Sequence, residues 1–133
     1  MNTLSTYDPE IAPNAESWLA LDEQERIDLV ERYHSSAKIK LPSVKAHAAF
    51  HAIIENQIAL GVASVVRAVP RLMKQGLTRH DAIHAIASVL AEHFYKLGNA
   101  KKNEARVTPQ EYDAAVDRLN ASDWLASHAE HPA

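Results

Sequence analysis

The stretch GLTRHDAIHAIASVLAEHFYKL, residues 76–97, decides the fold, because it ends one helix and starts the next. Gly76 suits the left-handed position that follows a helix, and Leu77 can pack back on Leu72 as in a Schellman motif. Thr78 is then a typical N-cap. The apolar residues after it recur every three or four positions: Ile83, Ile86, Leu90, Phe94 and Leu97. The stretch therefore predicts an amphipathic helix.

Similar signals predict helices on both sides of this one. Asp22 with Glu25 three residues later resembles a capping box, and Thr108-Pro109-Gln110-Glu111 combines a cap, a proline at the first helical position and an acidic third residue. The further helices are expected at 23–37, 44–60, 65–75 and from residue 108 onward. A break at 41–43 and a polar linker at 101–107 separate them. No strand-like alternation occurs, so the fold class is all-α.

The 133 residues suffice for one domain with one core. We expect a single-domain bundle of about five helices with an irregular N-terminal arm. The arm should cover residues 1–17, a helical metal-binding core residues 18–98, and a linker with a C-terminal helix packed on the core residues 99–133. A last short turn, capped by Ser122, is expected to carry Trp124 and Leu125.

Charge and composition exclude several function classes. The net charge is −3 with histidine neutral, which argues against an electrostatic nucleic-acid binder. No apolar run approaches the ~20 residues of a membrane span, and the first residues lack the pattern of a signal peptide. We therefore expect a cytoplasmic protein with neither nucleic acid nor a membrane as partner. The chain has no cysteine, so nitrogen and oxygen atoms must hold any transition metal.

Two histidines and a glutamate follow one face of the helix predicted at 44–60. His47, His51 and Glu55 are four residues apart, so each lies one turn above the last. At about 100° per residue, His51 falls within roughly 60° of His47 and Glu55 within about 80°. Phe50, Ile54 and Ile58 share this face. The pattern predicts two imidazoles and a carboxylate that point into the core.

The helix predicted to follow Thr78 repeats the arrangement. His80 and His84 are one turn apart, as a shared metal ion requires. On the helix at 23–37, His34 lies on the same side as Ile27 and Val30, so we expect it to orient a metal ligand by hydrogen bonding. The other three of the eight histidines are expected to face solvent: His93, His128 and His131.

Neutral imidazoles one turn apart can direct two nitrogens at one point, and two antiparallel helices supply two such pairs. We predict a metal site with His47, His51, His80 and His84 as ligands and Glu55 as fifth ligand or general base. These donors favour zinc or iron, with manganese behind them. An open metal position would let bound water attack a small-molecule substrate, as in a hydrolase, or let iron activate oxygen.

An alternative without metal is a helical interaction or oligomerisation module. The histidines would then be buried structural residues that form hydrogen bonds in the core. Trp18 and Trp124 could supply the contact with a partner or with a second copy in a homodimer.

The sequence also resembles a known family. The resemblance is carried by residues 18–27, by Tyr33-His34, by His47-Ala48-Ala49-Phe50-His51 with Glu55-Asn56-Gln57, and by residues 76–86. These segments are similar to an uncharacterised family of small bacterial helical proteins, catalogued only as a domain of unknown function. The resemblance covers roughly residues 18–97. It implies a shared helical fold and carries over no activity.

Overall fold

The structure is a computed structural model that describes residues 4–36, 44–99 and 108–128. Within these ranges it is all-helical, with no strand, which confirms the predicted fold class. The described helices are α1 (Ala15–Ala20), α2 (Glu23–Ser36), α3 (Val44–Leu60), α4 (Ala63–Lys74), α5 (Arg79–Asn99), α6 (Pro109–Arg118) and α7 (Ala121–His128). The described residues thus form seven helices where about five were expected.

The two additional helices, α1 and α7, are short and capped by asparagines. Asn14 accepts a hydrogen bond from the backbone N–H of Ser17 at 3.0 Å, and α1 buries Trp18 completely. Asn120, rather than Ser122, caps α7 and accepts from the N–H of Asp123 at 2.8 Å. Helices of six and eight residues hold too few apolar positions to show a clear period in the sequence.

The capping signals of the longer helices are confirmed. Asp22 and Glu25 bond each other's backbone N–H reciprocally, at 2.8 and 3.1 Å. Gly76 has a φ of +109°, and the N–H of Leu77 reaches the carbonyl of Leu72 at 3.1 Å, as a Schellman motif requires. α5 therefore begins where the sequence predicted.

Helix α4 begins at Ala63, earlier than the expected residue 65. Ser64 lies in its first turn and donates from Oγ to Asp113 of α6 at 2.6 Å. Pro70 lies inside the continuous helix on an exposed face, where solvent can reach the carbonyl of Val66 that loses its helical partner. The expected break at 41–43 and the linker at 101–107 lie outside the described residues.

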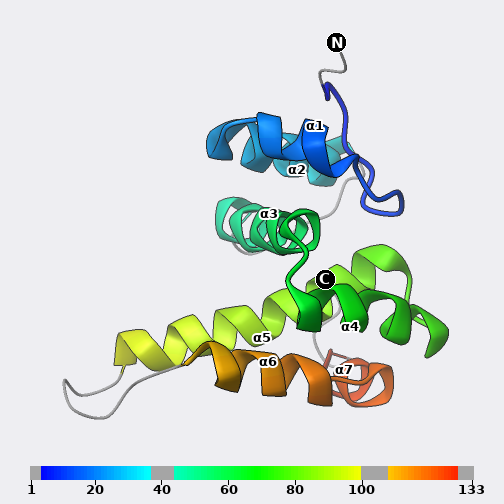
Figure 1. Cartoon of the computed structure of the whole chain (residues 1–133), viewed down its shortest axis with the longest axis vertical. Coiled ribbons are helices and arrows are strands. Elements are labelled where there is room, and N and C mark those ends of the chain that lie inside the picture. The colour runs from blue at the N-terminus through cyan, green and yellow to red at the C-terminus, as the bar shows by residue number, and fades with distance from the viewer. Residues whose placement is uncertain (1–3, 37–43, 100–107, 129–133) are drawn as a thin grey trace.

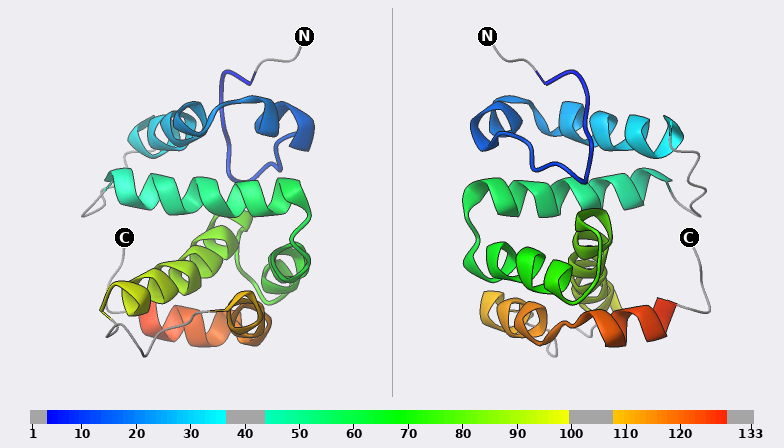
Figure 2. Two further views of the ribbon diagram at one scale, coloured as in Figure 1. Left: turned by 60° about the vertical axis from the view of Figure 1, so that its left-hand side comes forward. Right: turned by 90° about the vertical axis from the view of Figure 1, so that its right-hand side faces the viewer.

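Helix α3 separates two apolar clusters (Figures 1 and 2). On one side Ala48 and Ala52 pack with the arm, α1 and α2, where Trp18 is fully buried. On the other side Ile54 packs with α4, α5 and α6. Each fully buried aliphatic side chain such as Ile54 contributes about 1.5–3 kcal/mol of burial free energy. This packing places α3 between α2 and α5.

No single helix in the described ranges is long and apolar enough to cross a membrane. Only two helical segments taken together are long and apolar enough, Ala46–Leu60 and Ala63–Lys74, and the chain bends by 107° between them.

Candidate metal centre

Four histidines from three helices converge between α2, α3 and α5. They are His34 of α2, His51 of α3, and His80 and His84 of α5, and one ring nitrogen of each lies within 4.8 Å of the other three. His34, His51 and His80 are buried and His84 is half-buried. The protein therefore has a buried histidine cluster that could hold a metal ion.

The helical spacing explains the convergence on α5. His80 and His84 lie one turn apart with ring centroids separated by 4.0 Å. The ring of His34 lies 5.4 Å from that of His51 and 5.3 Å from that of His80. Because α2 and α5 both pack on α3, His34 of α2 and His51 of α3 come close to the pair on α5.

Three nitrogens of the cluster are buried without a hydrogen-bond partner in the described part of the chain. They are Nε2 of His34, Nδ1 of His51 and Nε2 of His80. Leaving a buried polar atom unpaired costs about 1–3 kcal/mol, and native proteins rarely do so. Three such atoms on the rings of one cluster fit a ligand that accepts lone pairs, which a transition metal ion does.

The second nitrogen of His34 fixes the protonation of its ring. Its Nδ1 lies 2.8 Å from the backbone carbonyl of Val30, which can only accept, so Nδ1 carries the proton. The buried Nε2 therefore presents a lone pair. Metal-binding histidines commonly bond a backbone carbonyl through their other nitrogen in this way. His34, predicted only to orient a ligand, thus has the geometry of a ligand itself.

His47 lies beside the cluster, where it contacts His84. Their Nε2 atoms are 2.8 Å apart and their ring centroids 4.3 Å apart, and both side chains are half-buried. At this distance either one nitrogen donates a proton to the other, or both lone pairs meet at one ion. Of the four histidines predicted as ligands, the structure brings His51, His80 and His84 together and leaves His47 at the edge.

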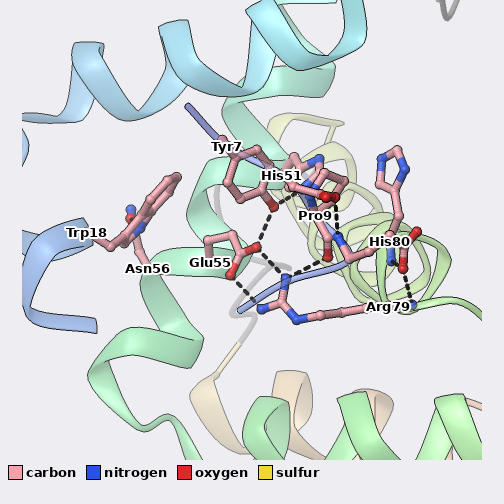
Figure 3. Close-up of polar contacts among 10 residues, drawn as sticks. Tyr7, Pro9, Trp18, His51, Glu55, Asn56, Arg79 and His80 are labelled. Atoms are coloured by element: carbon pink, nitrogen blue, oxygen red, sulfur yellow. Dashed lines mark hydrogen bonds and ion pairs between the residues drawn. The ribbon is translucent and has the colours of Figure 1, made fainter. Parts of the chain in front are cut away.

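Glu55 is buried but faces a different partner from the one predicted. Its two carboxylate oxygens accept from the guanidinium of Arg79 at 2.7 and 2.8 Å, and the hydroxyl of Tyr7 donates to it as well (Figure 3). This carboxylate lies outside the four-histidine group. A charged pair with both partners buried needs such complete hydrogen bonding, because desolvation is costly.

Sequence reasoning missed Tyr7 and Arg79. Arg79 directly precedes His80, and a glutamate on an apolar helix face requires a counter-charge, so that requirement was the signal for an arginine partner. Tyr7 lies in an arm without periodicity, and nothing local marked it as buried. It contacts His51 through Oη, 2.7 Å from Nε2.

The environment keeps these imidazoles neutral. Burial lowers the pKa of His51 well below its ordinary value, and neighbouring histidines lower it further. Burial likewise lowers the pKa of His34, and it lowers the pKa of His47 and of His80 to about 4. Neutral rings carry a free lone pair at neutral pH, which is the form that binds a metal.

No protein-family model, curated protein or solved structure matches this chain. The resemblance to the uncharacterised helical family therefore stays a prediction. What the fold and the site define is an all-helical protein with a histidine cluster suited to a metal ion.

Proposed function

We propose that this protein binds a transition metal ion through His34, His51, His80 and His84. The observation that carries the proposal is the set of three buried ring nitrogens that lack partners in the described residues. A core network of structural histidines would instead pair these atoms with donors and acceptors, so the interaction module explains them less well.

The donor set supports zinc or iron as the ion. Imidazole nitrogen suits both metals, whereas manganese prefers carboxylate and other oxygen ligands. The buried carboxylate nearest the cluster along α3 is Glu55, and Arg79 already pairs with both of its oxygens. Manganese therefore ranks behind zinc and iron, as the sequence already indicated.

A reaction at this metal would need an open position and a base. Four protein ligands close a tetrahedral zinc site, as in structural centres, whereas catalytic sites keep one position for water or substrate. The half-buried side near His47 and His84 is where a small molecule could enter. Because Glu55 is paired with Arg79, a hydrolytic reaction would have to take its base from elsewhere, and His47 is the nearest candidate.

The test is the metal content of untagged full-length protein, measured by plasma mass spectrometry after dialysis. We expect about one equivalent of zinc or iron, lost in His51→Ala. The matched control is His93→Ala. His93 also lies on a helix, but it is outside the cluster, and its Nδ1 lies 2.8 Å from the carbonyl oxygen of Val89. Metal-free protein that takes up no added ion, or equal metal content in His51→Ala, would refute the proposal.

A further inference from the structure

We infer that Tyr7, on the N-terminal arm, is a positioning residue of the metal centre, which fixes the nitrogen that His51 presents to the ion. Tyr7 acts together with Glu55 and Arg79, to which it is hydrogen-bonded (Figure 3). The inference rests on the proposed function, because it assigns to these three residues a role in the same site. It also makes the arm part of that site.

The donor and the acceptor of each hydrogen bond between Arg79, Glu55, Tyr7 and His51 can be assigned in turn, beginning with Arg79. Arginine only donates, and it donates to both oxygens of Glu55, at 2.7 and 2.8 Å, so this carboxylate is ionised and only accepts. Tyr7 must therefore donate its single hydroxyl proton to Glu55. The remaining contact of the hydroxyl, to His51, must then be one in which the tyrosine oxygen accepts.

That assignment determines the tautomer of His51. Its Nε2, 2.7 Å from the Tyr7 oxygen, carries the proton, so the lone pair lies on Nδ1. Nδ1 is the nitrogen of this ring that is buried with no partner in the described part of the chain. The nitrogen that carries the lone pair is thus the one without a hydrogen-bond partner among the described residues.

The tyrosine is well placed to hold this state. Its side chain is buried, and the ionised carboxylate of Glu55 accepts the hydroxyl proton. Its ring packs against Trp18 with centroids 5.5 Å apart and against His51 with centroids 5.4 Å apart. Packing holds the ring of Tyr7 in place, and the hydrogen bond to Glu55 holds its hydroxyl proton. Both are needed for Tyr7 to orient the His51 ring toward a metal ion.

Two further contacts join the arm to the helix that carries His80. The guanidinium of Arg79 donates to the carbonyl of Pro9 at 2.8 Å (Figure 3), and the carboxylate of Glu10 accepts from the backbone N–H of Arg79 at 3.0 Å. A carboxylate at a helix N-terminus is stabilised by the helix dipole. The arm, which passes α1 and α2 to reach α3 (Figure 2), therefore fixes α3 and α5 relative to each other.

The experiment compares zinc affinity of the untagged full chain with that of Tyr7→Phe, by competition with a chromophoric chelator. Removing the hydroxyl while keeping the ring should weaken zinc binding roughly 10- to 100-fold at unchanged stoichiometry, and alter the visible spectrum of the cobalt-loaded protein. Tyr112→Phe is the matched control. The hydroxyl of Tyr112 donates a 2.7 Å hydrogen bond to Gln57, and neither residue belongs to the histidine cluster. Its affinity and cobalt spectrum should match the wild type.

A second measurement needs no variant. Nitrogen-15 NMR of the metal-free wild type should find His51 protonated on Nε2 and bare on Nδ1. The opposite tautomer, or wild-type affinity and cobalt spectrum in folded Tyr7→Phe, would overturn the inference. Failure of the wild type to bind either zinc or iron would overturn the proposed function instead. The tautomer of His51 reports on the hydrogen bonds of Tyr7 alone, so the two failures are distinguishable.

Discussion

The Nε2 atoms of His47 and His84 lie 2.8 Å apart, and this contact joins the two helices, α3 and α5, that carry the paired histidines. Both side chains are half-buried, unlike the fully enclosed His51. At the proposed metal centre, His47 would either be an additional ligand on the accessible side or orient the ring of His84. In both cases its ring can be replaced more easily than that of His51.

The first prediction concerns His47→Ala. Solvent can enter the space left by a half-buried ring, so water should take the place of the lost nitrogen. We expect one ion per chain to remain, with an affinity lowered roughly 10- to 100-fold, as for residues that orient ligands. Metal titration followed by mass spectrometry checks both quantities. A complete loss of metal, as expected for His51→Ala, would make His47 an indispensable ligand and contradict this ranking.

The second prediction concerns metal removal. An ion that binds only the folded state stabilises it by about 2.7 kcal/mol at a free concentration 100 times Kd. For a chain of this size a strong chelator should then lower the Tm by roughly 10 °C. Differential scanning calorimetry with and without chelator measures the shift. The His51→Ala variant serves as control, since chelator should leave its Tm unchanged; an equal shift there would show that the chelator acts elsewhere.

Most of the helices could be predicted from the sequence, because their ends are specified by local chemistry. Thr78 accepts from the N–H of Asp81 and Thr108 from that of Glu111, both at 3.1 Å. Such caps depend on residues three positions apart and need no knowledge of the tertiary fold. α1 instead depends on the burial of Trp18 against α3, which no local pattern reveals.

The candidate site was predicted less completely, because periodicity gives the face of a helix and not its neighbours. The spacing of His80 and His84 was sufficient to pair them, since both lie on one helix. Placing His34 in the cluster, and Glu55 against Arg79, requires the packing of α2 and α5 on opposite faces of α3. Spacing alone therefore predicts which residue types could bind a metal, but it does not predict which residues pack together in the site.

The third prediction is a pH dependence of the metal-free protein. In the fold the pKa of His80 lies at about 4, lowered chiefly by burial, while the unfolded chain should show the ordinary value of about 6.5. Between these values the unfolded chain binds a proton that the folded chain does not, so stability falls as the pH falls through this window. His34, His47 and His51 act in the same direction, His47 less because it is partly exposed.

Thermal unfolding of chelator-treated protein tests this dependence between about pH 7 and pH 5. The Tm should fall by several degrees as the pH is lowered, and His80→Asn should flatten the curve. His93→Asn, a change outside the cluster, should preserve the wild-type slope. A Tm that rises toward pH 5 would mean that the imidazoles are stabilised in their charged form, contrary to their burial.

The last prediction contrasts two arginines that each pair with a carboxylate. The Arg79–Glu55 pair has side-chain exposures of 6% and 0%, whereas the Arg67–Asp117 pair, which joins α4 to α6, has 58% and 43%. Arg79→Met leaves an uncompensated buried carboxylate and should lower the free energy of unfolding by about 3–5 kcal/mol. Arg67→Met removes an exposed pair and should cost less than about 1 kcal/mol. Urea unfolding of both variants measures the difference, and equal costs would show that the buried pair is hydrated rather than sealed in the core.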